Sequence, residues 1–173
     1  MELEMKIKGL MIDPITNMPI IILRDPASSA VLPIWVGIFE ANAIALQIEK
    51  IVTPRPMTHD LLKSMITNMQ ASVEKVVITD LKDNTFYALI FLNHDGKLLP
   101  VDSRPSDALN LAARVGAPIL VDDAVMEHAF SGDRDAKLKE DEERLGLEPE
   151  RPGEWRSLSP ELVKELHPPP GTK

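Results

Sequence analysis

The sequence predicts an α+β fold, in which helices pack on a mixed, largely antiparallel sheet within a single compact domain. Most expected strands follow one another across short turns, as in hairpins, whereas a doubly wound parallel sheet needs a helix between successive strands. Runs with apolar residues at three- and four-residue spacing indicate the helices. We expect strands over residues 2–12, 18–23, 31–36, 72–81, 85–92 and 118–121, and one further short strand that ends at residue 101. We expect helices over residues 38–52, 58–69, 104–115 and 122–130.

The N-terminal elements are indicated by alternation and by turn residues. Residues 2–12 alternate between apolar and charged side chains, which is typical of a half-buried strand. The turn at Asp13-Pro14 links this strand to the next as a hairpin. Pro33 places the third strand at a sheet edge or at a bulge, because proline lacks an N–H group. The helix over residues 38–52 is expected to bury a stripe that ends at Ile51 or Val52.

The remaining elements are marked by turns and helix ends. Lys82-Asp83-Asn84 fits a hairpin turn, Gly116 fits a helix C-terminus, and Asp122 fits the N-cap of the last helix. The helix over residues 58–69 is expected to bury an apolar stripe of Leu61, Leu62, Met65, Ile66 and Met69.

Composition excludes several classes of site. Aromatic residues make up only 4% of the 173 residues, so the core must be aliphatic. The chain has no cysteine, which excludes disulfides, thiolate zinc sites and cysteine nucleophiles. The N-terminus does not resemble a signal peptide and no apolar run is long enough to span a membrane, so we expect a cytoplasmic protein. A net charge of −8 argues against a broad basic surface for nucleic acid, but allows a local basic pocket or a bridging divalent metal.

The chain changes character near residue 131. Residues 1–130 carry the expected helices and strands, whereas residues 131–173 form a charged, proline-rich extension, which we expect to be partly helical or disordered. Trp155 and the stretch from Leu158 to Leu166 are apolar enough to dock on the domain or on a partner.

Two short stretches contain most of the candidate functional residues. The first Arg-Pro motif, Pro54-Arg55-Pro56-Met57-Thr58-His59-Asp60, leads into a helix. One interpretation is structural: Thr58 is an N-cap, Asp60 complements the helix dipole and His59 is exposed. The other is that Arg55 clamps a phosphate near the helix N-terminus while His59 moves a proton or binds a metal.

The second Arg-Pro motif, Asp102-Ser103-Arg104-Pro105-Ser106-Asp107, also begins a helix. Capping explains Pro105 in the first turn and Asp107 near the dipole, but it does not explain Arg104, a cation at the positive end of a helix. Arg104 therefore needs an anionic partner, either Asp102 or a ligand. Asp102 and Asp107 together would suit Mg²⁺ or Mn²⁺. Glu40 is explained by the dipole of its own helix.

Four blocks in order resemble the bifunctional nuclease (BFN) domain family, over about residues 2–130. They are Leu32 to Gly37 with Glu40-Ala41, the first Arg-Pro motif with Leu61-Leu62, Thr85 to Ala88, and the second Arg-Pro motif with Ala108. The resemblance implies a compact α+β domain that forms homo-oligomers and acts as a nuclease on DNA and RNA.

Two hypotheses follow. The first is a nuclease that hydrolyses phosphodiester bonds, assisted by a divalent metal, with both motifs at one cleft. The second is a non-catalytic oligomeric binding or regulatory module, in which the arginines of both motifs form structural ion pairs. In the first, the candidate residues are His59, Asp60 and Asp107 as catalytic groups, Arg55, Arg104, Thr58 and Ser106 at the phosphate, and Asp102 and Asp107 at Mg²⁺ or Mn²⁺.

Overall fold

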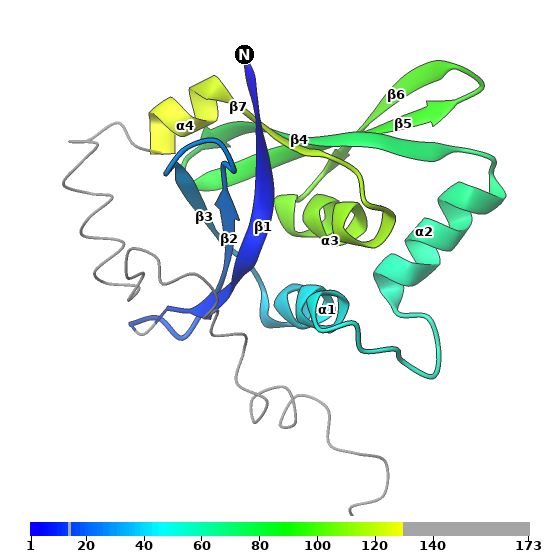
Figure 1. The fold of residues 1–173 in the computed structure, drawn as a ribbon, viewed down its shortest axis with the longest axis horizontal. Coiled ribbons are helices and arrows are strands. Elements are labelled where there is room, and N and C mark those ends of the chain that lie inside the picture. Colours follow the sequence, from blue (N-terminus) through cyan, green and yellow to red (C-terminus); the bar gives the residue numbers. More distant parts are fainter. Residues whose placement is uncertain (14, 130–173) are drawn as a thin grey trace, which may run out of the picture.

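The computed structural model describes residues 1–13 and 15–129, which form a seven-stranded mixed sheet with helices packed on it (Figure 1). The predicted α+β class is confirmed. The described chain holds β1 (Glu2–Ile12), β2 (Pro19–Arg24), β3 (Val31–Trp35), α1 (Ile38–Ile48), α2 (Thr58–Asn68), β4 (Ser72–Lys82), β5 (Thr85–His94), β6 (Lys97–Ser103), α3 (Pro105–Val115), β7 (Ile119–Asp122) and α4 (Asp123–Ala129). The expected extension over residues 131–173 lies outside the described residues, and among the described helices none is long and apolar enough to cross a membrane.

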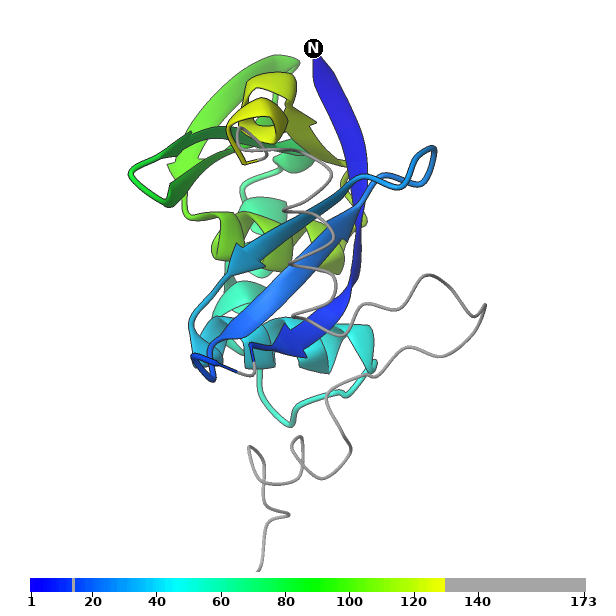
Figure 2. The ribbon, with the colours of Figure 1, turned by 90° about the vertical axis from the view of Figure 1, so that its left-hand side faces the viewer.

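The sheet has the strand order β3-β2-β1-β7-β4-β5-β6. Its neighbouring strands are antiparallel except for β4 and β7, which run parallel. β1 changes partner along its length: residues 2–5 pair with β7 and residues 6–12 pair with β2, with a register shift between Ile7 and Gly9. Figure 2 shows β1 running the height of the molecule beside β2 and β3. β3 is an edge strand, as Pro33 predicted.

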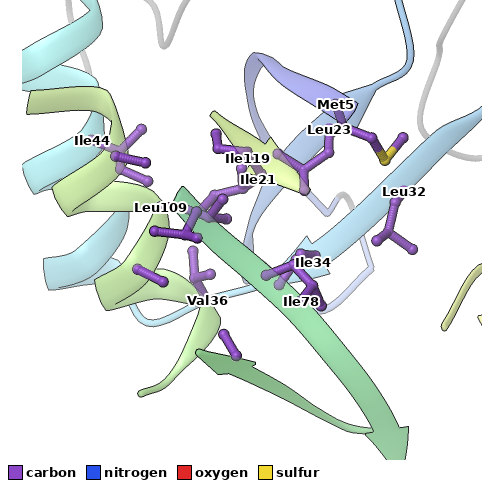
Figure 3. Packing of buried hydrophobic residues seen from close by; sticks show 14 of the residues in the cluster. Met5, Ile21, Leu23, Leu32, Ile34, Val36, Ile44, Ile78, Leu109 and Ile119 are labelled. Carbon is purple, nitrogen blue, oxygen red and sulfur yellow. The ribbon is translucent and has the colours of Figure 1, made fainter. Parts of the chain in front are cut away.

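The core is aliphatic, as the composition predicted. Buried Ile21, Ile34 and Ile78 of the sheet pack with Ile44 of α1 and Leu109 of α3 (Figure 3). Helix α3 contacts α1, α2, β4 and β5, so it is the central helix of the domain. Its position decides where the candidate residues meet.

The turns confirm several local predictions. Asp83 and Asn84 have φ of 48° and 58°, as a two-residue hairpin turn of type I′ requires. Gly116 ends α3 in the left-handed region at φ 73°, and Asp122 Oδ1 accepts a hydrogen bond from the backbone N–H of Ala124 at the start of α4.

The predicted end of α1 was wrong. The helix stops at Ile48 rather than Val52, because Lys50 adopts φ 55° and the N–H of Ile51 returns to the carbonyl of Leu46 at 2.9 Å. This hydrogen bond belongs to a Schellman motif, which closes a helix C-terminus. Ile51 and Val52 are therefore exposed, at 45% and 91%, instead of buried.

The predicted buried stripe of α2 was wrong for three of its five residues. Leu62 and Ile66 pack against the core. Leu61, Met65 and Met69 are exposed at 55%, 54% and 66%. The apolar periodicity identified the helix but spans a wider arc than the face that α2 buries.

Candidate functional site

The first turns of α1, α2 and α3 meet at Asp107 and Arg104. Arg104 is the N-cap of α3 and Pro105 occupies the first helical position, as the sequence predicted. Asp107 follows in the first turn, His59 lies in the first turn of α2, and Glu40 lies in the first turn of α1. We call Glu40, His59, Arg104 and Asp107 the helix-start cluster.

His59 and Asp107 join the two Arg-Pro motifs. His59 Nε2 lies 3.0 Å from Asp107 Oδ1, although 48 residues separate them in the chain. His59 is only 8% exposed, so the interpretation of an exposed histidine was wrong. Since an ionised carboxylate can only accept, the Nε2 atom carries the hydrogen, and Nδ1 of a neutral imidazole keeps the lone pair.

Arg104 bridges the carboxylates of two helices. Its Nε donates to Asp107 Oδ2 at 2.7 Å and its Nη2 to Asp107 Oδ1 at 3.1 Å. Its Nη1 lies 3.0 Å from Glu40 Oε1. The arginine side chain is nevertheless 64% exposed. A guanidinium has five N–H donors, so two remain for a ligand from solvent.

These contacts set the ionisation of Asp107. Burial raises the pKa of Asp107, but the hydrogen bonds from Arg104 and His59 outweigh it and hold the pKa below its usual range. The same pairing with Asp107, followed by that with Glu40, raises the pKa of Arg104. Asp107 and Arg104 are thus ionised at neutral pH, and Asp107 orients the imidazole as a carboxylate.

Asp60 belongs to a second network, centred on Arg114. Its Oδ1 accepts from Arg114 Nε at 2.7 Å, and its Oδ2 accepts from the N–H of Met57 at 3.0 Å. The Arg114 side chain is only 4% exposed. Arg114 also donates to the carbonyl oxygens of Asn110 and Ala43 and to the Asn110 side chain. This network fixes α2 against α1 and α3.

An open hollow of about 310 Å³ lies beside this network. Thr53, Pro56 and Met57 of the α1–α2 connection line it together with Asp60 and Arg114. Ions of both signs therefore border the hollow, but they are already paired with each other.

The other predicted site residues lie apart from the cluster or have different roles. Thr58 is exposed and is the first residue of α2; the N-cap is Met57, so the predicted Thr58 cap was wrong. Ser106 is buried, and its carbonyl accepts from Asn110 at 2.9 Å. Arg55 and Asp102 are exposed. Within the described chain, neither side chain contributes to the helix-start cluster.

The described residues contain no group of three or more His, Asp or Glu side chains that could hold a metal ion. Both oxygens of Asp107 already accept hydrogen bonds, from His59 and twice from Arg104. This donor set does not fit a resident Mg²⁺ or Mn²⁺ unless Arg104 moves away from Asp107.

Three residues of the two networks were not predicted. Glu40 was assigned only to the dipole, and Asn110 and Arg114 were not singled out. Arg114 lies in the last turn of α3, where a cation is explained by the helix dipole alone. No local signal reveals that it is buried against Asp60, because the contact spans 54 residues.

The model of the bifunctional nuclease domain matches residues 21–131. This range includes both Arg-Pro motifs and every residue of the helix-start cluster. The chain belongs to the bifunctional nuclease domain family.

Relatives in bacteria and plants agree with this assignment. The Mycobacterium tuberculosis protein Rv1829 is 40% identical over 126 residues, which are 73% of this chain and 75% of that protein. Bifunctional nuclease 2 of Oryza sativa subsp. japonica is 33% identical over 107 residues, or 60% of this chain and 33% of the rice protein. Bifunctional nuclease 1 of Oryza sativa subsp. indica is 29% identical over 105 residues, or 59% of this chain and 32% of that protein. The match therefore spans about a third of each rice protein.

Proposed function

We propose that this chain is a nuclease that hydrolyses phosphodiester bonds of DNA or RNA at the helix-start cluster. The 3.0 Å contact between His59 Nε2 and Asp107 Oδ1 carries the proposal, because it unites the two Arg-Pro motifs in one arrangement. A carboxylate that orients an imidazole is a recurring basis of general acid–base catalysis. The family and the names of the rice relatives support this reaction class.

His59, Arg104 and Arg55 have different roles in this reaction. His59 Nδ1 accepts a proton from the attacking water or returns one to the leaving oxygen, after a small opening of its buried site. The two unused N–H donors of Arg104 bind a non-bridging phosphate oxygen, as guanidinium groups do. Arg55, exposed between Pro54 and Pro56 on a stiff backbone, binds a neighbouring phosphate.

We also propose that a divalent metal assists the reaction, and this part of the proposal is tested separately. Glu40 and Asp107 would be the nearest carboxylate ligands if a substrate phosphate drew Arg104 away from them. Mg²⁺ or Mn²⁺ would supply Lewis-acid stabilisation of the phosphate there. Asp102 is exposed and is not needed for this arrangement.

A specific observation favours a second candidate, a non-catalytic homo-oligomeric module. Arg104 makes three contacts to carboxylates, so the arginine of the second motif already has structural partners. Arg114, which lies outside both motifs, is likewise buried against Asp60, whereas Arg55 of the first motif is exposed. The net charge of −8 also restricts nucleic acid to a local contact. In this case the same networks only hold three helices together.

Nuclease activity of pure full-length protein separates the two candidates. His59→Ala and Asp107→Asn should each lower the rate of cleavage of DNA and RNA by about 10²–10⁴-fold. The matched control is His94→Ala, since the His94 side chain is 44% exposed on β5. Equal cleavage by all four proteins would assign the activity to contamination or to another site. Absence of cleavage both with and without Mg²⁺ or Mn²⁺ would favour the oligomeric module. Loss of cleavage on addition of EDTA would establish that the reaction needs a divalent metal.

A further inference from the structure

We propose that Phe39 positions bound nucleic acid by stacking on one of its bases, next to the phosphate that Arg104 binds. Phe39 lies in the first turn of α1 and is 84% exposed. The identity of the ligand rests on the proposed function, but the residue itself belongs to neither Arg-Pro motif. It is a positioning residue, because it contacts a base rather than the bond that is cleaved.

Phe39 is the most exposed aromatic residue in the described part of the chain. Tyr87 and Trp35 are 44% and 39% exposed, and Phe86 and Phe91 are half-buried. A phenyl ring that stays in water forgoes the free energy that burial would provide. Because aromatic residues are only 4% of the chain and the core is aliphatic, Phe39 is not explained by packing. A ligand that covers its ring would recover this free energy.

The position of Phe39 on α1 brings its ring to the helix-start cluster. The next residue is Glu40, whose Oε1 atom lies 3.0 Å from Arg104 Nη1. Phe39 and Ala43 are four residues apart, so they lie on the same side of α1. The Ala43 carbonyl accepts a hydrogen bond from Arg114, so this side of α1 borders α3. Side chains lean toward the N-terminus of their helix, which directs Phe39 to the end of α1 that meets Arg104.

An exposed ring beside an exposed cation matches the two parts of a nucleotide. Arg104 is 64% exposed and keeps two N–H donors for a phosphate oxygen. Aromatic side chains stack on unpaired bases of any type, because every base has a π-face. Neighbouring Cα atoms are about 3.8 Å apart, so a base next to the phosphate on Arg104 can reach Phe39. An apolar protein surface over Phe39 would leave the donors of Arg104 without acceptors, which favours nucleic acid as the ligand.

Binding of a short single-stranded oligonucleotide to the full-length chain tests the proposal. Fluorescence anisotropy measures Kd, and a gel confirms that the strand stays intact. Phe39→Ala should raise Kd about tenfold. The same change should leave Kd unchanged for an abasic strand of equal length, which keeps the phosphates and lacks the bases. Equal Kd values for Phe39→Ala and the natural protein, or an equal loss on the abasic strand, would overturn the proposal.

Three further variants separate stacking from other effects. Phe39→Trp should preserve binding, because indole also stacks, whereas Phe39→Leu should weaken it, because leucine is apolar but has no π-face. Tyr87→Ala is the matched aromatic control and should leave Kd unchanged. Its neighbour Ala88 is buried in the core, so Tyr87 points to the sheet face opposite α3. A loss of affinity in Tyr87→Ala as large as that in Phe39→Ala would contradict a specific role of Phe39.

The failure of this proposal is distinguishable from the failure of the nuclease. Binding that depends on Phe39 without any cleavage would support stacking and remove the nuclease. Cleavage whose KM is the same in Phe39→Ala and in the natural protein would support the nuclease and remove Phe39. If Phe39→Ala converts an oligomer into monomers in sedimentation and leaves Kd unchanged, a second copy covers Phe39 and the proposal is wrong. It is also wrong if the natural protein binds no single strand.

Discussion

Arg114 Nε donates to Asp60 Oδ1 at 2.7 Å, which ties the last turn of α3 to the first turn of α2. Burial alone would raise the pKa of Asp60, but hydrogen bonds from Arg114 and the Met57 N–H outweigh it and lower the pKa. Arg114 also donates to Ala43 and Asn110, so one guanidinium links three helices. Asp60 therefore has a structural partner, and we expect its removal to act first on stability.

Replacing Arg114 should be among the most destabilising single changes in the domain. Arg114→Met removes the donors to Asp60 Oδ1, to the Asn110 side chain and to two backbone carbonyls. This should lower the free energy of unfolding by about 3–5 kcal/mol. Arg114→Lys should recover little, because an ammonium cannot reproduce the planar fork. Urea unfolding measures both.

Lys63→Met is the matched control, since within residues 1–13 and 15–129 exposed Lys63 donates only to the Arg114 carbonyl, at 3.1 Å. Its loss should stay within about 1 kcal/mol. Comparable losses for Lys63→Met and Arg114→Met would contradict a structural role of the Asp60–Arg114 pair.

The contrast between α3 and α2 shows how far the sequence predicts this fold. The start and end of α3 depend on Arg104, Pro105 and Gly116, which act locally, and the prediction was correct to one residue. Which side of α2 is buried depends on where α3 lies, and no local pattern encodes that; Met65 was therefore placed wrongly.

The candidate site, too, could be predicted from the sequence only in part. His59 and Arg104 were identified as candidates from their residue type, because helix capping requires neither of them. Their partners became known only from the fold: the His59–Asp107 contact spans 48 residues, and the partner of Arg104 on α1, Glu40, seemed explained by its own helix.

Acid should weaken the first hairpin through Asp13. A hydrogen bond from the N–H of Ile15 is the main cause that lowers the pKa of Asp13 to about 2, and the Trp35 indole also donates to this carboxylate, at 3.2 Å. Because the folded-state pKa lies below the ordinary value, the stabilisation is complete above about pH 4 and is lost as the pH falls toward 2. Thermal midpoints between pH 5 and 2 measure this loss.

Asp13→Asn should show a smaller decrease over the same range, because its side chain does not titrate. Asp95→Asn is the control, since Asp95 is exposed in a turn at φ 52°, which asparagine also adopts. If Asp13→Asn and the natural protein lose stability in parallel as the pH falls, Asp13 does not contribute to the loss of stability in acid.

Arg55 should contribute to nucleic-acid binding rather than to folding. It is exposed in the connection between α1 and α2, so Arg55→Ala should leave the thermal midpoint unchanged. If it neutralises one phosphate, binding of a short single strand should weaken and the slope of log K against log salt should fall by about 0.7. Lys6→Ala, which removes an exposed charge on β1, should change neither. An unchanged slope in Arg55→Ala would remove Arg55 from the proposed interface.

A double-mutant cycle on His59 and Asp107 tests whether the two side chains act together or independently. Each of His59→Ala and Asp107→Ala breaks the same 3.0 Å contact, so their effects on stability should be coupled by about 0.5–3 kcal/mol. Under the nuclease proposal, the double variant should also cleave no more slowly than the worse single variant, since residues that act as one unit are not additive. Pairing His59→Ala with Asp95→Asn gives the control cycle, in which coupling should vanish. Strong coupling in stability together with strictly multiplicative losses of activity would mean that the His59–Asp107 contact holds α2 against α3 without taking part in catalysis.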